Sequence, residues 1–180
     1  RKATEPKIGS LIWRKPYDTT YNSFIASFKP KYPNVTKQII NQLKVISTEY
    51  KSKSIFCYSA NGRGVEHIIL NRSMLEQNIG YNKYLSNVEG SKIKSFKMGN
   101  ILFIDSCLLF DGSLDSFCKS MEVETKLPIE DVMIEKGYWS LDKGSFMSNN
   151  VWMSGPIEKN KIEIEYCKND SLCLLNAIEK

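Results

Sequence analysis

The chain contains a single histidine among its 180 residues, and this scarcity excludes several kinds of site. His67 is the one imidazole and no Cys-x-x-Cys pair occurs, so the clustered ligands of a tetrahedral zinc site are lacking. A Ser-His-Asp or Cys-His centre would need His67 as its base, and no nucleophile motif accompanies it. Three aliphatic residues follow His67, and this apolar context favours a packing role for its ring.

Other signals are missing as well. No run of about 18 apolar residues occurs, so we expect no membrane-spanning helix. No Gly-x-x-x-x-Gly-Lys phosphate loop is present, and the Gly-rich stretch at 61–64 is too short for a dinucleotide fingerprint and predicts a plain turn. The amino end has neither an apolar signal core nor an initiating Met, which indicates a processed or partial chain rather than a secreted precursor.

The composition is that of a folded protein. With 42% hydrophobic and 25% charged residues, residues 1–180 predict one domain with a real core. Subtracting 20 acidic from 25 basic residues leaves +5, a mild excess that suits an acidic partner such as nucleic acid without requiring one. The cysteines are odd in number and scattered, which predicts reduced core thiols in an intracellular, reducing compartment. They are Cys57, Cys107, Cys118, Cys167 and Cys173.

Hydrophobic patterns in the first half of the chain predict alternating strands and helices. Residues 9–13 and 23–28 are short apolar runs, the second with the composition of a strand. Asn34 can cap a helix that carries an apolar stripe at spacings of three and four. Residues 54–58 predict a buried central strand, followed by a Gly turn and a helix over 65–75.

The second half begins with a predicted hairpin. Strand candidates at 92–97 and 101–104 flank a turn at 98–100. Ser113 can then cap a short helix with a single apolar face. From 122 to 156 the pattern weakens into Pro, Gly and aromatic residues, which predicts a long loop tethered by burial of Tyr138, Trp139 and Trp152.

A terminal helix follows this loop. Asn160 and Glu163 form an Asn-type capping box, and the helix is expected to run nearly to Lys180. Within it Tyr166 and Asp170 are four residues apart, so both side chains project from one face.

Several motifs in this order resemble one known family. The chain has Phe-Ile-Asp-Ser, then Gly-Ser-Leu-Asp-Ser-Phe-Cys-Lys, Lys-Leu-Pro, Ser-Gly-Pro and finally Tyr-x-x-x-Asp, at 103–106, 112–119, 126–128, 154–156 and 166–170. The series resembles the exonuclease region of protein-primed family-B DNA polymerases, known from linear plasmids, often mitochondrial, and from some phages. It spans residues 54–180, while residues 1–33 contribute least to the likeness.

The resemblance implies a fold and a chemistry. The fold would be α/β and ribonuclease-H-like, with a mixed sheet flanked by helices and a carboxylate cluster at one end. The activity would be 3′-to-5′ exonuclease hydrolysis, in which two divalent ions such as Mg²⁺ lie about 4 Å apart and act through carboxylate ligands.

Only part of the family's carboxylate set is retained. Its first motif, Asp-x-Glu-Thr, aligns with Pro-Tyr-Asp-Thr, so that Pro16 replaces the leading Asp and Asp18 replaces the Glu. In the second motif Val65 stands where an Asp is expected, and a shift of one residue brings Glu66 there instead.

The third motif survives as Tyr166 and Asp170. With one carboxylate kept, one altered and two missing, too little negative charge remains to hold two divalent ions. Asp170 and Asp18 are the expected metal ligands if the centre is active, and they are vestigial together with Glu66 and Tyr166 if it is not.

We therefore expect a non-catalytic relic without a cofactor, acting as a structural or nucleic-acid-associated subunit of a larger assembly with neighbouring proteins. A mitochondrial ribonucleoprotein such as the mitochondrial ribosome is the host that this ancestry indicates by analogy. Tyr32 or Tyr58 could stack on bases. The basic residues that could contact phosphates, or that merely solubilise the chain, are Lys29, Lys31, Lys92, Lys94 and Lys97.

Two alternatives stay open. One is a working exonuclease that uses Asp18, Glu66 and Asp170, with Asp105 as a further candidate, although an Asp-Ser pair at a strand end is commonly a turn or capping device. The other is a protein-interaction module based on exposed aromatic residues of the loop at 138–152.

Overall fold

The computed structural model divides the chain into two compact units. The first unit comprises Arg1–Ile39 and Lys126–Leu172, and the second comprises Ile40–Thr125 and Cys173–Lys180. The single domain expected over residues 1–180 stays a prediction. The structure describes residues 6, 8–27, 31, 34–60, 62, 65–79, 87–127, 137–140, 145–148, 151–153 and 161–180.

An antiparallel pair of strands opens the first unit. Strand β1 (Ile8–Trp13) pairs with β2 (Asn22–Ser27) along its whole length. Apolar residues near the end of this pair form a small core in which Ala26 and Val35 are fully buried. Strand β2 lies where the second apolar run predicted a strand, and β1 coincides with the first apolar run.

A second sheet of the first unit corrects the sequence-based expectation. Strands β7 (Gly137–Ser140), β8 (Ser145–Ser148) and β9 (Val151–Met153) form an antiparallel meander in chain order. The prediction of one long loop over 122–156 is therefore wrong for these segments. Strands of three or four residues are too short to show a clear alternation of apolar and polar residues. The side chains of Tyr138, Trp139 and Trp152 lie outside the described part, so their predicted burial stays a prediction.

Helix α4 (Lys161–Glu179) follows the meander and confirms the predicted terminal helix. The expected cap at Asn160 lies outside the described residues. The helix belongs to the first unit as far as Leu172, and its remaining residues belong to the second.

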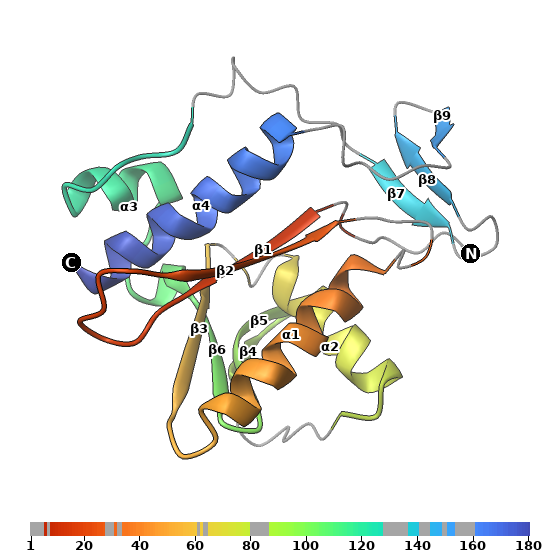
Figure 1. Cartoon of the computed structure of the whole chain (residues 1–180), viewed down its shortest axis with the longest axis horizontal. Helices are drawn as coiled ribbons and strands as arrows, with labels where there is room; N and C mark the ends of the chain where they lie inside the picture. Colours follow the sequence, from red (N-terminus) through yellow and green to blue (C-terminus); the bar gives the residue numbers. More distant parts are fainter. Residues whose placement is uncertain are drawn as a thin grey trace. The chain divides into compact units, whose positions relative to one another are not determined.

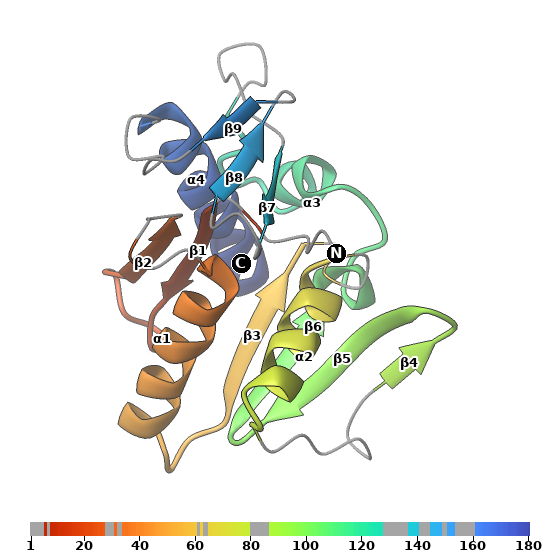
Figure 2. The same cartoon turned by 90° about the vertical axis from the view of Figure 1, so that its right-hand side faces the viewer.

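The second unit contains a four-stranded mixed sheet in the order β3-β6-β5-β4 (Figure 2). Strand β3 (Ile55–Ser59) runs parallel to β6 (Ile101–Asp105), whereas β5 (Lys92–Met98) runs antiparallel to both β6 and β4 (Asn87–Glu89). The predicted α/β class with a mixed sheet flanked by helices is confirmed.

The position of β3 differs from the expectation. Residues 54–58 predicted a buried central strand, but among the described residues β3 pairs only with β6, is an edge strand of the sheet and has no fully buried residue. The apolar composition of a strand does not determine how many neighbouring strands it pairs with.

The β5–β6 hairpin turns at Gly99 and Asn100, as the sequence predicted. Gly99 has φ +58°, which glycine adopts without the steric cost of a Cβ. The Asn100 side-chain amide donates to the carbonyl oxygens of Tyr50 and Lys53, at 2.9 Å each. These contacts join the hairpin tip to the turn that precedes β3.

Two helices cover one face of the sheet (Figure 1). They are α1 (Val35–Glu49), from Ile40 onward, and α2 (Glu66–Glu76). The predicted cap of α1 is confirmed, because the backbone N–H of Lys37 donates to Asn34 Oδ1 at 2.6 Å.

The opposite face carries a second cluster. Helix α3 (Leu114–Ser120) begins as predicted, with Ser113 Oγ accepting from the N–H of Ser116 at 3.1 Å. It packs with the last turns of α4 in a buried group that Tyr58 and Phe110 border. The buried members are Phe117, Cys118, Cys173, Leu174 and Ala177.

All five cysteines are free thiols, in agreement with the sequence-based prediction that they form no disulfide framework. Cys118 and Cys173 are buried, whereas the other three are partly buried. No helix in the described part of the chain has the length and apolar character needed to cross a membrane.

Candidate functional site

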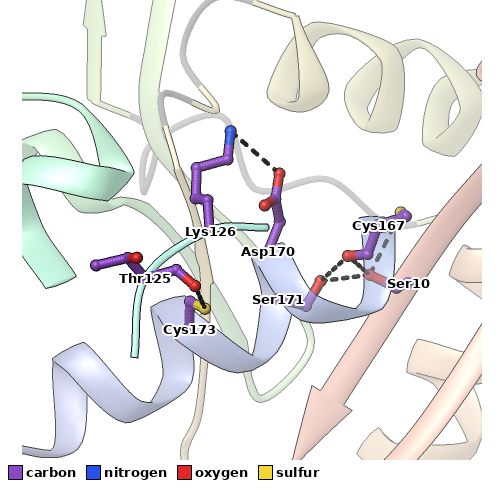
Figure 3. Close-up of polar contacts among 7 residues, drawn as sticks. All are labelled: Ser10, Thr125, Lys126, Cys167, Asp170, Ser171 and Cys173. Carbon is purple, nitrogen blue, oxygen red and sulfur yellow. Dashed lines mark hydrogen bonds and ion pairs between the residues drawn. The ribbon is translucent and has the colours of Figure 1, made fainter. Parts of the chain in front are cut away.

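Tyr166 and Asp170 project from the same face of α4, as their spacing predicted, and both contact Lys126. Figure 3 shows the contact between Asp170 and Lys126. The Lys126 ammonium nitrogen lies 3.4 Å from Asp170 Oδ2 and 5.3 Å from the centre of the Tyr166 ring. Lys126 belongs to the Lys-Leu-Pro segment, for which the sequence indicated no role in the site. We call these three residues the Asp170 centre.

The Asp170 centre is only half satisfied. Burial raises the pKa of Asp170 above its ordinary value, and the attraction of Lys126 opposes this rise without cancelling it. Burial also opposes the charged form of Lys126, but a hydrogen bond to Tyr166 and the Asp170 carboxylate outweigh it and raise the pKa of Lys126. The other carboxylate oxygen, Asp170 Oδ1, is buried and has no hydrogen-bond partner.

Polar contacts one helical turn away hold this part of α4 against β1. The Ser10 hydroxyl donates to the carbonyl oxygen of Cys167 at 2.9 Å and is hydrogen bonded to the Ser171 hydroxyl (Figure 3). Lys168 follows Cys167 on α4, and its ammonium group lies 6.0 Å from the centre of the Tyr21 ring. These contacts orient the turn of α4 that carries Asp170.

Asp18 lies in the exposed turn between β1 and β2, where its N–H donates to the carbonyl oxygen of Lys15 at 3.2 Å. The adjacent Tyr17 is fully exposed and has φ 70°, so this segment is a surface turn rather than the end of a buried strand. The charged neighbour of Asp170 is Lys126, not Asp18.

Glu66 and Asp105 come together in the second unit. Glu66 is the first residue of α2, and its pKa is raised by partial burial and then by the negative charge of Asp105. Asp105 is fully buried and accepts from the N–H of Cys107 at 2.9 Å, which caps a 3₁₀ turn over Ser106–Leu108. The capping role considered for Asp105 is confirmed.

His67 lies beside these carboxylates and is 1% exposed. Its Nδ1 is 2.6 Å from the carbonyl oxygen of Ile93, which can only accept, so Nδ1 carries the proton. Its Nε2 is 2.8 Å from the Ser59 hydroxyl, which donates to it in the neutral ring. Burial lowers the pKa of His67, against the opposing effects of the Ile93 carbonyl and Asp105. We call His67, Ser59 and the Ile93 carbonyl the His67 centre.

Gly62, which precedes α2, lies directly against the His67 centre. A Cβ on Gly62 would lie 1.9 Å from Ser59 Oγ and 2.8 Å from His67 Nε2, so a larger residue would force one of these side chains to shift. The ring also meets Phe96 edge-on, at 5.2 Å between ring centres. The packing role predicted for His67 is confirmed. Its serine partner was missed, and the only local signal was a serine at the end of a strand eight residues earlier.

The lysines proposed to contact phosphates occupy different surroundings. Lys31 and Lys92 are exposed, Lys94 is ion-paired with Glu89, and Lys97 is partly buried on β5. Lys29 and Tyr32 lie outside the described residues. The other candidate stacking residue, Tyr58, packs against the α3–α4 cluster.

Within the part of the chain that the structure describes, no group of three or more His, Cys, Asp or Glu side chains could hold a metal ion. In addition, Asp170 Oδ2 already faces the ammonium group of Lys126.

Comparison with known proteins adds no relative. No protein-family model matches the chain, and neither a curated protein nor a solved structure is significantly similar to it.

Proposed function

We propose that the chain is a non-catalytic exonuclease-like domain with a ribonuclease-H-like fold, derived from a protein-primed family-B DNA polymerase. It acts as a structural or nucleic-acid-associated subunit of a larger assembly. The proposed host is a mitochondrial ribonucleoprotein such as the mitochondrial ribosome, by analogy with the mitochondrial plasmids that carry such polymerases.

The ion pair between Lys126 and Asp170 is the observation that supports a non-catalytic role. In a two-metal nuclease the carboxylates bind divalent cations directly. Here the nearest cation to Asp170 Oδ2 is a protein ammonium group, which neutralises the carboxylate without a metal ion. A carboxylate that faces its own ammonium group does not need a bound metal ion as counter-charge.

The remaining candidate carboxylates support the same conclusion. Asp18 lies on an exposed turn, where a carboxylate is freely hydrated and gains little from binding an ion. Asp105 uses a carboxylate oxygen to cap a 3₁₀ turn. Glu66 starts a helix, where the helix dipole offsets part of the cost of burying its charge without a metal ion.

One observation favours the alternative of a working 3′-to-5′ exonuclease. Asp170 Oδ1 is buried without a hydrogen-bond partner, and an unsatisfied carboxylate oxygen is a site where a cation could bind. A single oxygen of this kind is one ligand, whereas Mg²⁺ requires six, several of them carboxylate or substrate oxygens in a two-metal site.

A nuclease assay separates the two functions. End-labelled single-stranded DNA and RNA are incubated with the purified chain in Mg²⁺ or Mn²⁺, beside Asp170→Ala and the matched control Asp115→Ala. Asp115 is paired with Lys119 on the surface of α3 and has no part in the Asp170 centre. We expect no metal-dependent shortening of either substrate by any of the three proteins.

Shortening by the wild-type chain and by Asp115→Ala, but not by Asp170→Ala, would overturn the proposal and establish the exonuclease. Shortening that survives in Asp170→Ala would indicate a contaminating nuclease. The host is tested by sedimentation of a tagged chain from mitochondrial lysate, where we expect migration with a large particle that ribonuclease treatment shifts.

A further inference from the structure

The two faces of the four-stranded sheet differ in how they are covered. Directly opposite residues on neighbouring strands share a face, so Cys57, Phe103 and Phe96 form one row across β3, β6 and β5. Phe96 and Phe103 are buried and stacked at 4.4 Å, and burial raises the pKa of the Cys57 thiol to about 12. This row lies under α1 and α2.

The adjacent row points to the other face. It consists of Phe56, Leu102 and Lys97, which are directly opposite one another on the same three strands. Phe56 is 57% exposed, and Leu102 and Lys97 are partly exposed. We call these three residues the open row.

The next row along the strands marks where the cover on this face begins. Tyr58 and Ile104 are directly opposite on β3 and β6, and Tyr58 packs against the cluster formed by α3 and the last turns of α4. Within the second unit, the open row therefore lies beside a covered part of the sheet and is itself accessible.

The open row combines an exposed aromatic ring with a basic side chain. A parallel strand pair such as β3–β6 is normally covered on both faces, so an exposed aromatic ring on it needs an explanation. Lys97 is the only charged residue of the row, and its charge is positive. A flat surface with an aromatic ring beside a basic side chain is the arrangement that binds single-stranded nucleic acid, since bases stack on the ring and a phosphate meets the cation.

We propose that the open row binds single-stranded nucleic acid, with a base stacked on Phe56 and a phosphate contacted by Lys97. This inference rests on the nucleic-acid association in the proposed function and gives that association a place on the second unit. Phe56 and Lys97 are two strand spacings apart, about 10 Å, a separation that a short single strand and the flexible lysine side chain can bridge. Base pairs in a duplex are already stacked and cannot lie on the ring.

Binding is tested in EDTA, so that any nuclease activity is suppressed. Fluorescence anisotropy is measured with fluorescein-labelled single-stranded RNA of mixed sequence, its DNA counterpart and an RNA duplex. We expect Phe56→Ala to weaken single-strand binding by about 5- to 150-fold, the range for loss of one base stack. Phe56→Trp should retain binding.

The charge contribution has a separate readout. Lys97→Gln should reduce the slope of log affinity against log salt by about 0.7, the value for one phosphate contact with a single strand. Matched controls are Leu75→Ala, an exposed apolar residue of α2 on the covered side, and Lys44→Gln, an exposed lysine of α1. Both controls should bind as the wild type does, and thermal unfolding should show that every variant is folded.

Several results would overturn the inference. Equal affinities for Phe56→Ala and Leu75→Ala would show that the open row is not the binding surface, although nucleic-acid association itself would stand. Duplex binding as tight as single-strand binding would exclude stacking on Phe56. No binding of any oligonucleotide would leave a protein partner as the occupant of this face. Metal-dependent shortening in the nuclease assay would refute the relic function whatever the anisotropy shows.

Discussion

The His67 centre and the Asp170 centre both contain a titratable side chain beside hydroxyl and charged groups, but the protein satisfies them to different degrees. Both ring nitrogens of His67 have hydrogen-bond partners, and the ring is 1% exposed. The Asp170 side chain is 30% exposed, faces Lys126 through one oxygen, and leaves the other oxygen without a partner. A fully satisfied centre stabilises the fold, whereas a half-satisfied centre is where a ligand or proton can act.

This difference has an energetic consequence. Removing one member of a buried, fully paired network leaves its partners unsatisfied, and each such group costs about 1–3 kcal/mol. Removing a partly exposed charge costs much less, because water replaces the lost partner and the median exposed ion pair contributes about 0–1 kcal/mol. Stability measurements on matched variants can therefore test the difference between the two centres.

The largest expected effect is that of His67→Ala. The change removes the contact with Phe96 and leaves the Ser59 hydroxyl and the Ile93 carbonyl without their partner. We expect a loss of about 2–5 kcal/mol in the free energy of unfolding, measured by urea denaturation. The control Ile68→Ala, on the same helix and 43% exposed, should lose less than about 1 kcal/mol. Similar losses for the two variants would show that the His67 centre has no special structural role.

Gly62→Ala should have the next largest effect. The added Cβ would meet Ser59 Oγ and His67 Nε2 at distances that atoms do not adopt, so the loop or the hydrogen bond has to shift. We expect a loss of about 1–3 kcal/mol, which is typical of an overpacked site. The double variant Ser59→Ala, Gly62→Ala removes the closest clash and should recover part of this loss. A single variant as stable as the wild type would show that Gly62 does not lie against Ser59 and His67.

The features that could be predicted from sequence are those with a local cause. The caps at Asn34 and Ser113 and the turn at Gly99 each depend on a few neighbouring residues, and all three form as expected. The edge position of β3 was not predictable, because strand order depends on pairing between distant segments. The short strands β7–β9 were missed because they carry too few residues for a periodic signal.

The same distinction applies to the candidate site. Tyr166 and Asp170 share a face of one helix, which follows directly from a spacing of four residues. Their partner Lys126 approaches from a segment far away in the sequence, and no local pattern indicates it. Asp18 was assigned to the site because of its position in a sequence motif. Its exposure depends on the turn that the β1–β2 pair forms, which the motif does not predict.

The pH dependence of stability gives a smaller effect from the His67 centre. Because the pKa of folded His67 lies below its ordinary value of 6.5, its contribution is complete above that pH. The contribution decreases as the pH falls from 6.5 toward the folded pKa, since the unfolded chain then binds the proton more tightly. Urea denaturation from neutral pH downward should show this decrease in the wild type.

Glu66 also binds a proton as the pH falls. Because its pKa is raised in the folded chain, this protonation increases stability and opposes the effect of His67. The measurement is therefore made in a Glu66→Gln background, with and without His67→Gln. The decrease should be present while His67 is intact and absent once His67→Gln has replaced the ring with an amide that does not titrate. A decrease of equal size in both proteins would assign it to other groups and remove this support for a neutral, satisfied His67.

The smallest expected effect is that of Asp170→Asn, which keeps the shape of the side chain and removes its charge. Burial raises the pKa of Asp170 despite Lys126, so the ionised carboxylate is not favoured by folding. We expect the unfolding free energy of the variant at neutral pH to equal or slightly exceed that of the wild type, with a difference below about 1 kcal/mol.

The direction in which pH changes the stability of the wild type relative to Asp170→Asn tests the difference between the two centres. As the pH falls through the folded pKa toward the ordinary value of 3.8, the wild type should gain stability relative to Asp170→Asn, because the folded chain binds the proton more tightly. A relative loss on acidification would mean that the ion pair with Lys126 outweighs burial. The Asp170 centre would then be a satisfied structural element like the His67 centre, and the distinction between the two would fail.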